Sequence, residues 1–149
     1  MSEKESKVAF RRIFFKTWAK HRAKLPLDQF EQQMVFVIQQ YPEYHEMLSN
    51  PDQFLQKEYP PTSLDSNPFL RMGIHMSLVE QLHLDQPQGI REIYNALSTQ
   101  LGNPALAEQH MIVSLANTLW AAQAEGRFPT DEEYLADLKD LCSSQSFRQ

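Results

Sequence analysis

The chain has 149 residues, of which 42% are hydrophobic and 22% are charged, and its formal net charge at pH 7 is −5. This composition is typical of one globular domain and excludes a disordered chain, while the single cysteine excludes an internal disulfide. No apolar run is long enough for the core of a signal peptide or for a transmembrane helix, so we expect one cytoplasmic domain over residues 1–149, with frayed ends at 1–6 and 143–149.

Charge is distributed unevenly. Residues 1–24 hold eight Lys or Arg and two acids, a net of +6, whereas the remaining residues hold six Lys or Arg and 17 acids, a net of −11. Because phosphate contacts need a basic face, the acidic majority argues against a nucleic-acid partner. The basic segment at the start of the chain is therefore the part to consider for an acidic partner.

Four glycines and the absence of Asn-Gly or Asp-Gly turns favour helices over strands. The apolar periodicity predicts an all-α, compact single-domain bundle of about six to eight helices. We expect these helices at about 7–23, 28–40, 42–49, 51–58, 67–85, 88–101, 103–125 and 130–142, with those at 67–85 and 103–125 in the centre.

Helix-end signals divide the chain at these boundaries. Three Asn-Pro pairs, with an N-cap residue followed by proline at the first helical position, predict helix starts. They are Asn50-Pro51, Asn67-Pro68 and Asn103-Pro104. Thr130 and Glu133 form a capping-box pattern, and Gly102 and Gly126 suit helix C-termini.

The first predicted helix carries an apolar arc and a basic remainder. The arc, expected to pack on the core, contains Phe10, Ile13, Phe14, Thr17, Trp18 and His21. Phe15 falls outside it, which makes Arg11, Arg12, Phe15 and Lys16 candidates for docking an acidic protein partner. Three other interpretations are an ordinary solvated basic face, association with a membrane surface, and an intramolecular contact of this basic segment with the acidic remainder of the chain.

The helix at 67–85 is apolar nearly all round, which is typical of a buried helix. Arg71 lies on it, and a buried guanidinium needs a partner because an unpaired buried charge is costly. Glu43, Glu46 and Glu108 are the candidate partners. Arg71 is therefore predicted to form a structural ion pair or, alternatively, an anion clamp.

Histidines and carboxylates are scattered over the central helices, and no strong enzymatic motif is present. We predict no cofactor. The alternative is a divalent transition metal held by His/Glu side chains on facing helices. Its candidate ligands are His45, His75, Glu80, Glu43 and Glu108. Arg71, four residues before His75, argues against this alternative because its charge would repel a cation.

Several segments resemble a small bacterial family catalogued as domain of unknown function 1841. The matching segments, within residues 10–141, are Phe14–Trp18, Pro26-Leu27, Tyr41–His45, Asn67–His75, Glu80-Gln81, Asp85–Ile90, Leu119-Trp120 and Ala122-Gln123. The resemblance implies a helical domain of this length and a bacterial cytoplasmic origin, and it implies no activity.

The resemblance also implies a set of histidines and glutamates that this chain has partly lost. Family members tend to carry histidine at the positions of Tyr41 and Arg71, and His or Glu near Gln109, Val113 and Asn117. Such a set would form a metal or catalytic site, and its partial replacement here argues against one. We therefore expect a non-enzymatic protein-interaction or regulatory module, with metal binding as the alternative.

Overall fold

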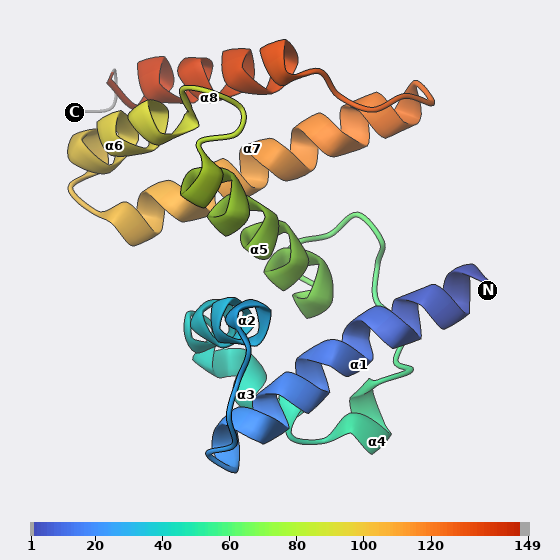
Figure 1. Ribbon diagram of the computed structural model, residues 1–149. Helices are drawn as coiled ribbons and strands as arrows, with labels where there is room; N and C mark the ends of the chain where they lie inside the picture. The colour runs from blue at the N-terminus through green and yellow to red at the C-terminus, as the bar shows by residue number, and fades with distance from the viewer. Residues whose placement is uncertain (1, 147–149) are drawn as a thin grey trace. The chain divides into compact units, whose positions relative to one another are not determined.

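The computed structural model describes residues 2–146, and of residues 144–146 only the backbone. Within that range the chain is all α-helical, as predicted, and has no strand. In chain order the elements are α1 (Glu3–Arg22), α2 (Gln29–Gln39), the 3-10 turn η1 (Pro42–Tyr44), α3 (His45–Leu48), α4 (Pro51–Phe54), α5 (Pro68–Leu84), α6 (Ile90–Leu101), α7 (Pro104–Ala124) and α8 (Asp131–Ser146) (Figure 1).

The ends of the chain are more helical than the sequence indicated. α1 begins at Glu3, four residues before the predicted start, because the Ser2 hydroxyl accepts a hydrogen bond from the Glu5 amide at 3.1 Å and caps the helix. α8 continues to Ser146, beyond the predicted end at residue 142. The remaining parts of the predicted frayed ends, residue 1 and residues 147–149, lie outside the described residues.

The three Asn-Pro signals have different structural outcomes. The Asn103 side chain accepts hydrogen bonds from two amides at the start of α7, and Asn67 accepts one at the start of α5. Asn50 makes no cap bond to α4, and its side-chain amide donates instead to the carbonyl of Glu46. The Asn-Pro pair therefore marks a helix start at all three places, but its asparagine caps the helix at only two of them.

α4 is four residues shorter than predicted. It ends at Phe54, and the carbonyls of Leu55 and Lys57 accept hydrogen bonds from the Arg11 guanidinium at 3.2 and 2.7 Å. These carbonyls face a side chain of α1 and do not continue a helical ladder, so a long-range contact ends the helix.

The chain divides into two compact units, residues up to Met72 and residues from Gly73 onward. The boundary falls inside α5, so its first turn belongs to the first unit and its remainder to the second. Our expectation of one domain stays a prediction. None of the described helices is long and apolar enough to cross a membrane.

In the first unit, α1 packs against α2 and α3. Aromatic and aliphatic side chains from these helices are buried, and the rings of Phe14 and Phe15 lie 5.9 and 5.7 Å from that of Phe69 at the start of α5. Burial of rings this large supplies much of the stability of a small helical unit.

In the second unit, α6, α7 and α8 pack against one another (Figure 1). The buried side chains include Ile93 and Leu97 of α6, Met111 of α7 and Leu138 of α8. The Tyr134 hydroxyl of α8 donates a hydrogen bond of 2.8 Å to the side-chain carbonyl of Gln81, which ties α8 to α5.

Candidate functional site

The inward face of α1 differs from the predicted one. Phe15, predicted to lie off the core-facing arc, is buried, and so is Arg11. Phe10 and Ile13, predicted to face the core, are 44% and 42% exposed. The predicted arc was right for Phe14, Thr17 and Trp18 and wrong for Phe10 and Ile13, because the buried face is rotated towards Arg11 and Phe15. Arg11 and Phe15 therefore do not form a free docking surface.

Arg11 is buried because its environment satisfies it. Besides its two carbonyl acceptors, its guanidinium lies 5.2 Å from the ring centroids of both Tyr59 and Phe69. A cation between hydrogen-bond acceptors and aromatic faces can be removed from water without an uncompensated charge. Arg11 is thus a structural residue that links α1 to the segment following α4.

The exposed side of α1 still carries the remaining partner candidates. Arg12 and Lys16 are four residues apart on one face, with the exposed Ile13 beside them. Within residues 2–146, neither of the two cations makes a hydrogen bond or an ion pair. This small basic face with an apolar centre remains a candidate for an acidic partner.

Arg71 forms an ion pair with Asp65, which was not among the partners predicted from the sequence. Its guanidinium donates to the Asp65 carboxylate at 3.2 Å and to the Leu64 carbonyl at 3.4 Å. Asp65 is almost fully exposed, so the Coulomb contribution of the pair to stability is small.

Two of the five predicted metal ligands belong to the first unit. His45 is half-buried, its Nε2 lies 2.9 Å from the Ile38 carbonyl, and its ring stands 4.4 Å from that of Trp18. An imidazole nitrogen engaged with a carbonyl and a ring packed on tryptophan are typical of a structural histidine. Glu43 lies exposed in η1.

The other three predicted ligands belong to the second unit, where two of them approach. His75 is 1% exposed, and its Nε2 lies 3.9 Å from the Glu108 carboxylate on α7. Burial raises the pKa of Glu108 because desolvation disfavours the charged carboxylate. Burial also raises the pKa of Tyr94, with a further increase from the Glu108 charge.

Glu80 lies exposed on α5. Among the residues that the structure describes, no group of three or more His, Cys, Asp or Glu side chains is arranged to hold a metal ion. Metal binding stays an untested alternative.

The most prominent exposed apolar side chain was not singled out from the sequence. Phe128 lies in the loop between α7 and α8 and is 89% exposed, whereas the next most exposed large apolar residues among those described, Leu25 and Leu84, are each 53% exposed. A single phenylalanine between glycine and proline is common in ordinary loops. It belongs to no helical or strand periodicity, so the sequence pattern gives no sign that it is exposed. Its exposure is visible only in the folded chain.

The loop that carries Phe128 is held at both ends. Gly126, with a φ of 71°, closes α7, and the Arg127 amide donates to the Ala122 carbonyl at 3.0 Å. The Arg127 guanidinium contacts Glu125 at 2.7 Å and Glu133 through two nitrogens at 2.8 and 3.2 Å. At the start of α8, the Thr130 hydroxyl accepts a hydrogen bond from the Glu133 amide, as the capping pattern predicted. Phe128 is therefore presented by a loop of defined geometry.

Comparison with known proteins gives a family. The family model described as domain of unknown function (DUF1841) matches residues 6–140, which is most of the chain. The chain belongs to this family. No curated protein and no solved structure matches it. Membership in the DUF1841 family confirms the resemblance seen in the sequence, and a functional proposal must come from the geometry of the chain.

Proposed function

We propose that this DUF1841 protein is a non-enzymatic helical module that binds a partner protein through the loop carrying Phe128. The exposure of this ring is the observation that supports the proposal. Aromatic side chains, including phenylalanine, are enriched in the cores of protein interfaces, because they bury a large area at little entropic cost. The contacts of Arg127 hold the loop in place before binding, so less conformational entropy is lost when a partner binds.

The charges of the segment that carries the ring indicate which kind of partner surface would fit it. The segment 125–133 holds Glu125, Asp131, Glu132 and Glu133 against Arg127, a net of −3. Such a rim is complementary to a partner whose apolar pocket is bordered by Lys or Arg. The same rim would be repelled by anionic lipid headgroups, so a protein pocket is favoured over a membrane surface.

The basic face of α1 is a second contact region in this proposal. Arg12, Ile13 and Lys16 would meet an acidic region of the same partner or of another one. Deleting the first 24 residues is not a suitable test, because Phe14, Phe15 and Trp18 are core residues of the first unit. Point substitutions of the exposed residues are needed instead.

The test places a photo-crosslinking phenylalanine analogue at position 128 in living cells and, as a control, at Phe30 of α2, which is 51% exposed. The proposal predicts a discrete adduct at position 128 that is absent at position 30. The partner protein captured in that adduct is then identified and purified without the crosslink. Its affinity is measured for the wild type, for Phe128→Ala and for Phe30→Ala. We expect Phe128→Ala to raise Kd at least about tenfold, as hot-spot truncations do, and Phe30→Ala to leave it unchanged.

Equal adducts at both positions, or equal affinities of both variants, would overturn the proposal. Sedimentation of the wild type with anionic vesicles, abolished in Phe128→Ala, would replace it with a membrane-binding function.

A further inference from the structure

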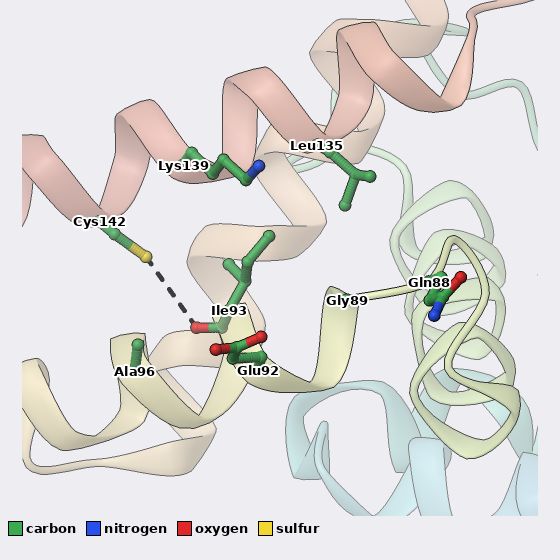
Figure 2. Close-up of a pocket in the computed structure, with 8 residues that line it drawn as sticks. All are labelled: Gln88, Gly89, Glu92, Ile93, Ala96, Leu135, Lys139 and Cys142. Atoms are coloured by element: carbon green, nitrogen blue, oxygen red, sulfur yellow. Dashed lines mark hydrogen bonds between the residues drawn. The ribbon is translucent and has the colours of Figure 1, made fainter.

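A hollow lies in the second unit, between the start of α6 and α8 and apart from the Phe128 loop. It has a volume of about 430 Å³, and its lining comes from the segment just before α6, from the start of α6 and from one side of α8 (Figure 2). Cavities of this size accept small organic molecules. Because it faces solvent, a ligand can enter without any rearrangement of the helices.

Residue size explains why the two helices leave space here. Gly89, which directly precedes α6, and Ala96 on α6 line the hollow and have little or no side chain, whereas Glu92 and Ile93 of α6 line it with longer side chains. On α8 the facing positions are Leu135, Lys139 and Cys142, on one stripe.

The walls of this hollow carry opposite charges that are not paired. Figure 2 shows Glu92 extending from α6 and Lys139 from α8, on opposite walls. Within the described part of the chain, neither charged group makes an ion pair or a hydrogen bond, with the other or with any third residue. Ile93, Ala96 and Leu135 provide the apolar surface between them. The hollow thus presents an anion, a cation and an apolar floor to one guest.

From this arrangement we propose that the α6–α8 hollow binds a free amino acid with an apolar side chain. The ligand ammonium faces Glu92, the ligand carboxylate faces Lys139, and the side chain covers the apolar floor. Each charged group of the ligand finds the opposite charge on one wall, which a ligand with a single charge cannot do. The role goes beyond the proposed interaction with a partner protein and does not depend on Phe128.

The cysteine at the end of the hollow is not part of the proposed chemistry. The Cys142 thiol lies 3.9 Å from the Ile93 carbonyl, and burial raises its pKa. A thiol that stays protonated is a weak nucleophile. The site is therefore a reversible binding site.

The experiment follows backbone amide NMR shifts of the full chain with three related probes. L-leucine carries both charges, L-leucinamide lacks the carboxylate, and N-acetyl-L-leucine lacks the ammonium. We expect leucine to shift the amides around Glu92 and Lys139 with a Kd of about 1 mM, and each singly charged probe to bind at least about fivefold more weakly.

Variants assign each charge. Lys139→Gln should weaken leucine binding about fivefold and leave leucinamide unchanged, because that probe has no carboxylate to lose. Glu92→Gln should weaken leucine and leucinamide and leave N-acetyl-leucine unchanged. Ala96→Leu, which fills the hollow without altering a charge, should abolish binding of leucine. Glu132→Gln and Lys57→Gln, outside the hollow, are the controls.

The proposal is overturned if no probe shifts the lining amides at about 10 mM, or if Lys139→Gln weakens leucine and leucinamide equally. Amide spectra that match the wild type away from the substitution establish that each variant is folded. Phe128→Ala should bind leucine normally, so a failure of this proposal and a failure of the proposed partner interaction are distinguishable.

Discussion

At the scale of single residues, Arg11 shows how a charged side chain becomes part of a core. Its neighbour Arg12 has the same chemistry and lies exposed. The difference between them comes from two carbonyls after α4 and two aromatic rings, all more than 40 residues away along the chain. Helical periodicity cannot anticipate these partners.

The pair offers a matched test of this interpretation. Arg11→Ala removes two charge-assisted hydrogen bonds and the contacts with both rings, so we expect the free energy of unfolding to fall by about 1–3 kcal/mol. Arg12→Ala should change it by less than about 0.5 kcal/mol, as is usual for exposed positions. Urea titration followed by circular dichroism measures both. Equal losses in the two variants would contradict the structural role of Arg11.

Glu108 gives a prediction about pH. Burial raises its pKa above the ordinary value of 4.5, so the native state holds the proton more tightly than the unfolded chain does. The resulting stabilisation is complete below pH 4.5 and is lost as pH rises through the raised pKa. Glu108→Gln keeps a neutral group there at every pH.

We therefore expect Glu108→Gln to raise the Tm by about 2 °C over wild type at pH 8, and the gain to shrink towards zero near pH 4. The exposed Glu132→Gln on α8 is the control and should show no such pH-dependent difference. A variant that is less stable than wild type at pH 8 would instead mean that the ionised carboxylate attracts His75 more than burial penalises it.

At the scale of elements, the Asn-Pro pairs show what local sequence can determine. Proline at the first helical position works through its own fixed φ and missing amide, so all three helix starts were predictable. Whether the preceding asparagine also caps depends on its side-chain rotamer. That rotamer is set by competing acceptors such as the Glu46 carbonyl, which the Asn50 side chain uses.

Substitution of the caps separates the two cases. Asn103→Ala removes an acceptor shared by the Ala105 and Leu106 amides, and should cost about 1 kcal/mol of unfolding free energy. Asn50→Ala removes no cap bond and should cost less than half as much. Chemical denaturation of the two variants side by side decides this, and an equal cost would show that proline placement and not side-chain capping sets both helix starts.

At the scale of the whole molecule, two compact units share one helix. The boundary between Met72 and Gly73 lies within α5, where successive backbone hydrogen bonds run across it. Breaking either unit would fray a helix that the other unit also uses. This continuity favours cooperative unfolding of the two.

Calorimetry tests that expectation. One thermal transition, with a calorimetric enthalpy equal to the van't Hoff enthalpy, is expected if the chain behaves as the single domain that the sequence indicated. In that case Arg11→Ala, in the first unit, should shift the whole transition. Two resolved transitions, with the variant moving one of them, would show that the units are separate domains.

What the sequence determined by itself is local: the helical class, the approximate bounds of the helices, the proline starts and the glycine ends. These follow from periodicity, fixed dihedrals and capping chemistry that act within a few residues. The tertiary structure decided which face of α1 is buried, that Asp65 pairs with Arg71, and that Phe128 and the Glu92–Lys139 hollow face solvent. Those outcomes depend on side chains brought together from distant positions, and packing and desolvation act on whatever is near in space.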